Sequence, residues 1–137
     1  MADKTRERSS TKRNNNARQF RSADSNFHLD YMAIDQTEVI DFVSTDKITG
    51  DVIVTISDHL DWDSDIYHLE ILQKKLNAYI AFVETEQIYK DYPNSKGNKI
   101  IFQIVSKYEY PKRGQEFLIK ANEITNSIGI KLRLKVL

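Results

Sequence analysis

The sequence predicts an α+β fold of two layers, in which two helices cover one face of a four-stranded mixed sheet in the order ββαβαβ. Three observations lead to this prediction. Four short segments carry the β-branched, aromatic or alternating pattern of strands, and two longer segments repeat apolar residues at helical spacing. Turn residues separate these segments. A chain of 137 residues is long enough for one domain with a buried core.

The first two strands are predicted to form a β-hairpin. Residues 39–45 and 51–57 are rich in β-branched and aromatic side chains. The sequence "DKITG" between them supplies a turn that includes Gly50.

The first helix is predicted from about Ile66, where the apolar residues change to helical spacing. The residues of the inward stripe are Leu69, Leu72, Leu76, Tyr79, Ile80 and Val83. Ile71 and Phe82 form a second apolar strip beside this stripe, so we expect the helix to be covered on more than one side. The helix should end before Pro93, because a residue that precedes proline is disfavoured in the helical region.

A strand, a helix and a strand follow. The segment "KIIFQIVSKY" is apolar on nearly both faces, which is typical of the middle of a sheet. The second helix begins near Pro111 and Gly114, and its predicted inward residues are Phe117, Leu118, Ala121, Ile124 and Ile128. Gly129 stands where a C′ glycine belongs. The closing "IKLRLKVL" alternates strictly, and this last unit should be a right-handed parallel crossover.

The composition excludes several classes of function. The 20 basic and 20 acidic residues cancel, so no overall charge selects nucleic acid or membrane surfaces. There is no cysteine, which removes disulfides, thiolate nucleophiles and Cys-ligated metals. No apolar run approaches the ~20 residues that span a bilayer. We therefore expect a cytoplasmic protein with no membrane partner.

Residues 1–31 are predicted to be a disordered tail, followed by a single domain at residues 32–137. The tail has 7 basic and 4 acidic residues and few large apolar ones, whereas the remainder has 13 basic and 16 acidic residues. Its basic character would allow transient contact with nucleic acid. Met32 also looks like a natural start for the domain, so the alternative is that the tail is an N-terminal extension.

The stretch "SDHLDWDSDIYHLE" concentrates titratable side chains. Asp61, Asp63 and Asp65 alternate as the first ligands of an EF-hand loop would, but the glycine and the bidentate glutamate of that loop are absent. A looser metal-dependent or hydrolytic site is an alternative, and its residues would be His59, Asp61, Asp63 and His68.

Helix capping explains most of the same residues. Asp63 or Ser64 is a natural N-cap, and carboxylates stabilise the positive end of a helix dipole. If Asp63 is the cap, Trp62 and Tyr67 are spaced to form a hydrophobic staple. His68 then lies beside the core stripe, where a histidine usually has a packing role.

A candidate functional cluster remains after this interpretation. Gln73 and Asn77 lie one turn apart on a flank of the apolar stripe, where amides usually bond to neighbouring loops; the alternative is that they face a ligand. The residues of the candidate cluster are His59, Asp61, Trp62, His68, Gln73 and Asn77.

The catalytic inventory is thin. Ser57, Asp58 and His59 have the residue types of a hydrolase triad, but neighbours along a strand point to opposite faces. The four glycines are scattered, so there is no phosphate-binding loop. The sequence favours a non-enzymatic protein, and we assign no catalytic residue, metal ligand or cofactor.

Two sets of residues are candidates for an interface. The outward face of the last strand carries Lys131, Arg133 and Lys135, and the uncovered sheet face is expected to add Asp41, Thr55 and Gln103. This face lacks the aromatic row of sheet-type RNA binders, which disfavours nucleic acid, and lysine also protects sheet edges. A tyrosine cluster is expected near the turn after the first helix and the end of the third strand, with members Tyr89, Tyr92, Tyr108 and Tyr110.

The segments "VIDFVSTDKITGDVIVTISDHLDW", "HLEILQKKLNAYIAFVE" and "KLRLKVL" together resemble a family of small bacterial proteins of uncharacterised function. The resemblance extends from about Ile34 to Leu137, and "SDHLDW" with "HLEILQKKLNAY" is its specific part. It implies a single-domain cytosolic protein and carries over no catalytic residue. Small α/β proteins of this size often act as partners, including immunity proteins of bacterial toxin systems, but that is an analogy of fold.

The sequence thus predicts a protein-binding module that acts as a homodimer or with one dedicated partner. The first alternative is the metal-dependent or hydrolytic site around His59 and His68. The second is weak binding of nucleic acid through the basic tail and the last strand.

Overall fold

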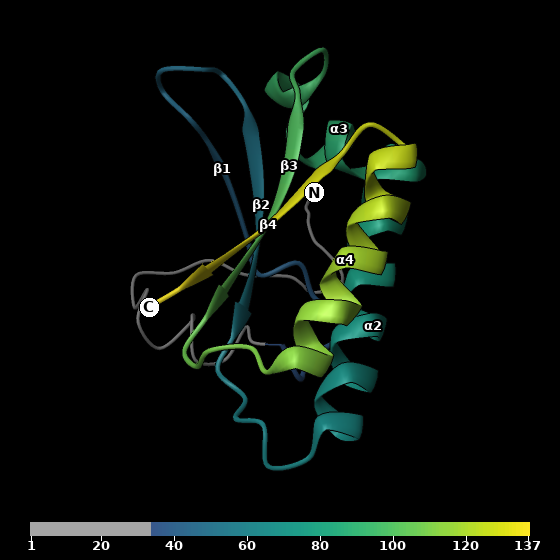
Figure 1. Cartoon of the computed structure of the whole chain (residues 1–137). Coiled ribbons are helices and arrows are strands. Elements are labelled where there is room, and N and C mark those ends of the chain that lie inside the picture. Colours follow the sequence, from purple (N-terminus) through teal and green to yellow (C-terminus); the bar gives the residue numbers. More distant parts are fainter. Residues whose placement is uncertain (1–33) are drawn as a thin grey trace, which may run out of the picture.

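The structure is a computed structural model and describes residues 34–137. One sheet of four strands is made by β1 (Phe42–Thr45), β2 (Val52–Asp58), β3 (Ile100–Ser106) and β4 (Lys131–Val136). The long helices α2 (Asp65–Glu84) and α4 (Lys112–Ser127) lie on the same side of this sheet (Figure 1). The short helices α3 (Gln87–Asp91) and η1 (Pro93–Ser95) connect α2 to β3. The predicted α+β class and element order are confirmed; the predicted tail at 1–31 lies outside the described residues.

The strands follow one another across the sheet in sequence order, β1-β2-β3-β4. β1 runs antiparallel to β2, whereas β2, β3 and β4 are parallel, so the sheet is mixed as predicted. β3 lies between two parallel neighbours, which explains why its sequence is apolar on nearly both faces. β1 and β4 form the two edges.

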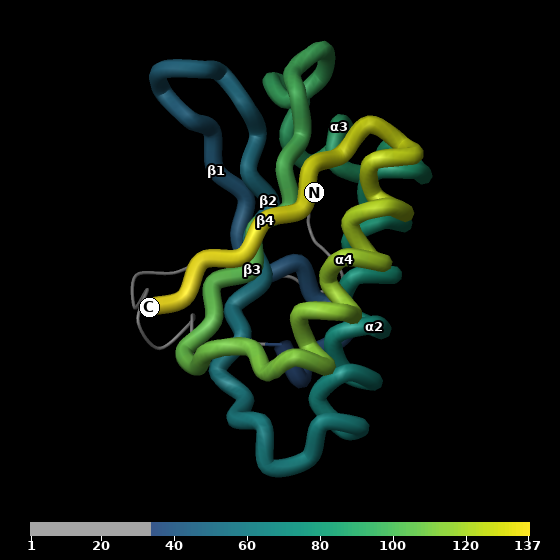
Figure 2. Tube along the Cα trace, viewed as in Figure 1, coloured from purple at the N-terminus to yellow at the C-terminus, as the bar shows by residue number. Residues whose placement is uncertain are grey.

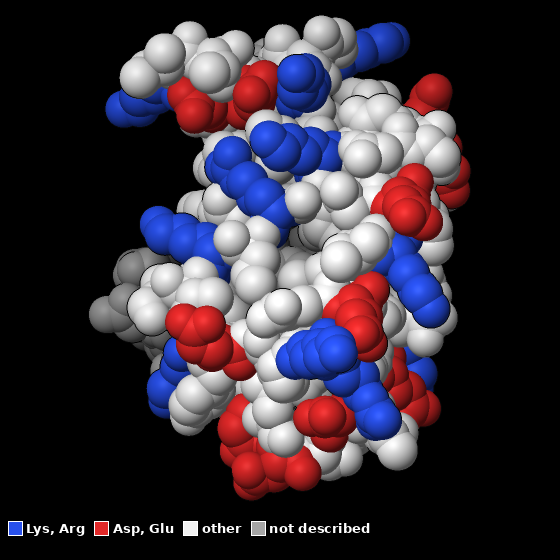
Figure 3. Space-filling view, viewed as in Figure 1, with Lys and Arg blue, Asp and Glu red and all other residues white. Residues whose placement is uncertain are grey.

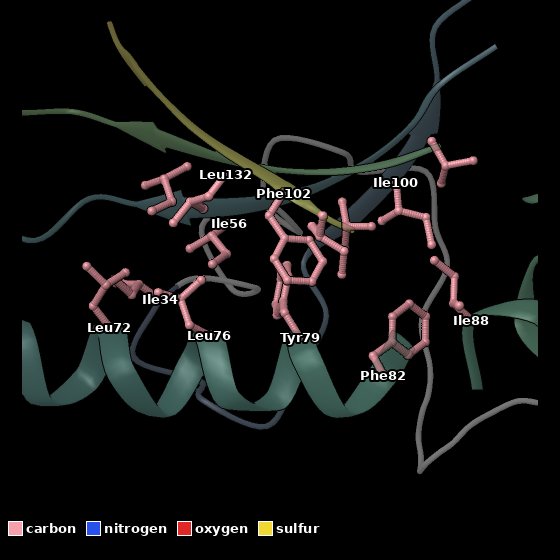
Figure 4. Packing of buried hydrophobic residues seen from close by; sticks show 14 of the residues in the cluster. Ile34, Ile56, Leu72, Leu76, Tyr79, Phe82, Ile88, Ile100, Phe102 and Leu132 are labelled. Carbon is pink, nitrogen blue, oxygen red and sulfur yellow. The ribbon is translucent and has the colours of Figure 1, made fainter. Parts of the chain in front are cut away.

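The core lies between the sheet and α2. Leu72, Leu76 and Tyr79 of α2 are buried and point towards the apolar side chains of β2 and β3 (Figure 4). The ring of Tyr79 meets that of Phe102 edge to face, with the ring centroids 5.7 Å apart. The sheet side of this core is formed by Val52, Val54, Ile56, Ile100, Phe102, Ile104 and Leu132.

β1 begins later than predicted, and this changes the position of Asp41. The strand starts at Phe42 rather than Val39, and Asp41 is only 6% exposed. The prediction that Asp41 lies on the uncovered face is therefore wrong. Its side chain turns inward because the ammonium of Lys75 and the backbone N–H of Ser57 both donate to its carboxylate there.

The predicted first helix is in fact two helices. α2 ends at Glu84, and Thr85 caps it. The backbone N–H and the hydroxyl of Thr85 both donate to the backbone carbonyl of Ala81. Glu86 then adopts a left-handed conformation, with φ of 65°, which reverses the chain before α3. The N-cap is Ser64, which accepts from the backbone N–H of Tyr67. No staple forms between Trp62 and Tyr67, because Tyr67 is half exposed and Trp62 packs elsewhere.

α4 buries a narrower stripe than predicted. Ile124 is 59% exposed and Ile128 is 38% exposed, whereas Thr125 is buried. Ala121 and Thr125 mark the side of α4 that faces the sheet. With a rotation of about 100° per residue around the helix axis, the side chain of Ile124 points about 80° away from that side. Gly129 is confirmed as the C′ residue, with φ of 82°. Its N–H and that of Ile130 close the helix on Asn126 and Thr125 in a Schellman motif.

Within residues 34–137, no helix combines the length and the apolar character that crossing a membrane requires.

Candidate functional site

A buried carboxylate lies at the carboxyl end of β2. Asp58 is 1% exposed. Its side chain accepts hydrogen bonds from His68 Nε2 at 2.8 Å, from the backbone N–H of Leu60 at 3.2 Å and from the hydroxyl of Tyr110. Three donors therefore satisfy this carboxylate without water. Asp58 occupies the inward position that follows Val52, Val54 and Ile56 along the strand.

His68 is held on both sides by acceptors. Its Nδ1 lies 2.9 Å from the carbonyl oxygen of Asp61, and its Nε2 faces the Asp58 carboxylate. The Asp61 carbonyl can only accept, so Nδ1 carries a proton and donates to it, and a second hydrogen bond joins Nε2 to the Asp58 carboxyl group. Trp62 stacks on the imidazole, with centroids 3.7 Å apart and planes inclined by 19°. His68 and Asp58 thus form a buried hydrogen-bonded pair under an indole.

The Asp58–His68 pair has no capacity left for catalysis. A general base needs a free lone pair within reach of a substrate, and His68 is 1% exposed with both nitrogens engaged. The same contacts leave no nitrogen to bind a metal. The pair instead joins the end of β2 to the start of α2, and Tyr110 adds the loop after β3 to the same network. The loops after β2 and β3 meet at one end of the sheet (Figure 2).

Trp62 fills the space outside the carboxyl ends of the parallel strands, where α/β proteins commonly bind ligands. Its ring meets Tyr110 edge to face, with centroids 4.7 Å apart, and passes close to the backbone of Gly114 in α4. Burial, followed by the charge of Asp58, raises the pKa of the Tyr110 hydroxyl. The indole Nε1 is buried and has no hydrogen-bond partner among the described residues. Side chains of the protein itself occupy this position.

A second buried pair of polar side chains consists of Asp41 and Lys75. Lys75 lies in the middle of α2 and is 0% exposed. Its Nζ donates to Asp41 Oδ1 at 2.7 Å and to the backbone carbonyls of Gln36 and Val39 at 2.7 and 2.6 Å. The ammonium therefore ties the segment 34–41 to the middle of α2. Such a pair needs these extra hydrogen bonds to offset the desolvation of two charges.

The Tyr79 hydroxyl completes this pair. It accepts from the backbone N–H of Asp41 at 2.9 Å and donates to the carbonyl of Thr55. Burial raises the pKa of Asp41 to about 6, although Lys75 lowers it. Burial also lowers the pKa of Lys75, against the attraction of Asp41. Both shifts have one cause, because the low polarity of the core disfavours each charge.

With this geometry in place, the chain can be compared with known proteins. Residues 32–137 match the profile of a family described as a family of unknown function, DUF6572. The chain belongs to DUF6572. No curated protein and no solved structure matched it. The sequence resemblance to a family of uncharacterised proteins is thereby confirmed.

The structure of this DUF6572 member disperses the candidate cluster. Trp62, His68 and the backbone of Asp61 stay together, through the stacking and the hydrogen bond described above. Asp61 contributes its backbone carbonyl rather than its carboxylate, and His59 is exposed. Gln73 and Asn77 are exposed, so they do not bond to a loop beneath them. Over residues 34–137, no three His, Asp or Glu side chains are grouped to hold a metal ion.

The four tyrosines of the predicted DUF6572 interface do not form one cluster. Tyr89 and Tyr92 lie at or beside α3, at the end of the sheet where β3 begins, whereas Tyr108 and Tyr110 follow the other end of β3 (Figure 1). Tyr110 is 3% exposed and belongs to the Asp58 network. Tyr92 borders a cavity of about 260 Å³ between the β1–β2 hairpin and η1.

The face of the sheet away from α2 and α4 carries the basic row that the sequence predicts. Lys131, Arg133 and Lys135 are exposed on β4, and Figure 3 shows basic side chains along the course of this strand. Arg133 Nε donates to Gln103 Oε1 on β3 at 2.8 Å. Phe42 on β1, 51% exposed, supplies an apolar side chain on the same face. We call Lys131, Arg133 and Lys135 the basic row.

Sequence reasoning missed the two residues around which the DUF6572 core is cross-linked. Lys75 falls within the apolar stripe, because 72, 75, 76 and 79 share one helix face. Asp58 continues the inward alternation of β2. In both cases, a charged residue at a core position was the signal that a buried partner exists.

Proposed function

We propose that the chain is a non-enzymatic protein-binding module of the cytoplasm and that the uncovered face of the sheet is its binding surface. The observation that carries the proposal is the basic row on edge strand β4 together with exposed Phe42 on the opposite edge strand β1, both on the sheet face that no element of residues 34–137 covers. No Asp or Glu occupies an outward position of the four strands, so the positive charge of this face is not neutralised from within the sheet.

The buried polar networks support a binding role over catalysis. The side chains best suited to acid–base chemistry, Asp58 and His68, satisfy one another out of reach of solvent. On this face the four strands carry a single aromatic ring, Phe42, and therefore no row on which bases could stack. A protein partner suits its mixture of apolar and charged side chains better.

Affinity capture from the native host with three matched proteins tests the proposal. We expect the wild type to retain a partner that Arg133→Glu retains at least tenfold less. Lys120→Glu, which reverses a charge on the exposed face of α4, should retain it fully. Light scattering in solution decides whether the partner is a second copy. A monomer that captures nothing, or equal capture by all three proteins, would contradict the proposal.

A further inference from the structure

The outer edge of β4 presents backbone groups that can pair with another strand. The N–H of Leu137 donates inward to Ser106 of β3. Since successive residues of a strand point their N–H groups to opposite sides, those of Leu132, Leu134 and Val136 point outward. The contact of the Leu132 N–H with Asn122 Oδ1 of α4, at 3.3 Å, agrees with this assignment.

Asn122 covers only the first part of the edge. Among residues 34–137, no hydrogen bond reaches the N–H groups of Leu134 and Val136. Both side chains are partly exposed on the helix side of the sheet. Within the described part of the chain, the edge therefore has backbone N–H groups without a hydrogen bond, an apolar side and a basic side.

The basic row selects among possible occupants of the edge. If β4 paired with β4 of a second copy, two basic rows would lie opposite each other on one face of the joined sheet, which is destabilising. A strand with acidic side chains on that face would instead place each carboxylate beside Lys131, Arg133 or Lys135. Apolar side chains at its alternate positions would meet Leu134 and Val136.

We propose that β4 binds an extended acidic segment of another protein as a fifth strand, with carboxylates over the basic row and apolar residues on the helix side. This inference rests on the proposed function and deepens it, because it names the partner's chemistry and mode of binding. Backbone hydrogen bonds supply affinity in this mode, and the alternating side chains supply specificity.

Fluorescence anisotropy with a labelled peptide that alternates Glu with Val or Thr tests the proposal. A strand added at one edge uses the amides of alternate residues only. We therefore expect N-methylation of one alternate set to weaken binding at least tenfold, and N-methylation of the other set to have a small effect. Equal affinity of both methylated peptides, whether high or low, would show that pairing with an edge is not involved.

Charge exchange provides an independent arm of the test. Arg133→Glu should bind the acidic peptide at least tenfold more weakly and should gain affinity for a peptide with Lys in place of Glu. Lys120→Glu should bind the acidic peptide like the wild type. A single-stranded oligonucleotide that binds as tightly as the peptide would assign the basic row to nucleic acid and overturn the proposal.

The two proposals fail in different ways. If a host protein is captured through Arg133 but no peptide binds, the binding module remains and the added strand is refuted. If light scattering shows a dimer that Arg133→Glu abolishes, the occupant is a second copy. If nothing is captured and no peptide binds, both proposals fall.

Discussion

At the scale of single residues, the ammonium of Lys75 is the donor on which three buried acceptors depend. Replacement by methionine keeps the length of the side chain but leaves Asp41 Oδ1 and two backbone carbonyls without their Lys75 donor. We expect Lys75→Met to lower the free energy of unfolding by about 3–5 kcal/mol, measured by urea denaturation.

Lys74→Met is a matched control for this substitution. Lys74 is next in sequence, is 60% exposed and makes only a long contact of 3.9 Å with Glu70. We expect a change within about 0.5 kcal/mol. Similar losses in the two variants would show that burial of Lys75 does not determine the effect.

Gly114 is a second position with a specific expectation. A Cβ there would lie 2.9 Å from Trp62 Cη2 and 3.1 Å from Tyr110 Cδ2. Alanine favours a helix over glycine by about 1 kcal/mol, but overpacking costs about 1–3 kcal/mol, so we expect Gly114→Ala to destabilise the protein slightly.

Fluorescence measures the local effect of Gly114→Ala, because Trp62 is the only tryptophan of the chain. We expect its emission to shift in the folded state of this variant and to stay unchanged in Glu116→Ala, on the exposed side of the same helix turn. Increased stability with unchanged emission would mean that the indole does not pack against the α4 backbone.

At the scale of elements, the boundary between α2 and α3 is set by one strained residue. Glu86 has φ of 65°, a conformation that costs a side chain-bearing residue about 1–2 kcal/mol more than glycine. We expect Glu86→Gly to raise the free energy of unfolding by up to about 1 kcal/mol. Glu70→Gly, in the interior of α2, should lower it by about as much. Thermal unfolding of both variants tests this, and destabilisation by both would contradict it.

How far the elements were predictable depended on whether local or tertiary contacts determine them. The alternation of β4 and the terminating Gly129 are local patterns, and both are confirmed. The start of β1 was wrong, because Asp41 leaves the strand pattern to reach Lys75, which is 34 residues away in sequence. Likewise, the candidate cluster around His59 contained His68 but could not reveal Asp58 and Tyr110 as its partners, since that contact spans separate loops.

At the scale of the whole molecule, the Asp41–Lys75 pair makes stability depend on pH. The pKa of Asp41 is raised from an ordinary value of 3.8 to about 6 in the folded protein. Between these values the folded state holds a proton that the unfolded state releases. The contribution of Asp41 to the free energy of unfolding is therefore largest below about pH 4. It falls by on the order of 3 kcal/mol as the pH rises through about 6.

Comparison with Asp41→Asn isolates this dependence, because all other carboxyl groups titrate in both proteins. We expect the stability difference, wild type minus variant, to fall between pH 4 and pH 7 in urea denaturation. Loss of the Lys75 proton in the variant would also lower this difference as pH rises, because burial disfavours the charged amine and so the variant gains stability when the amine becomes neutral. A difference that rises with pH would contradict the raised pKa of Asp41.

The contacts of Lys75 also bear on the order in which the chain assembles. They join residues separated by 34 to 39 positions, so they can form only once α2 is in place. Contacts that close such long loops tend to form after the rate-limiting step of folding. Stopped-flow measurements on Lys75→Met should then show a refolding rate close to that of the wild type and a much faster unfolding rate. The ammonium would thus act as a latch that determines how long the folded chain persists.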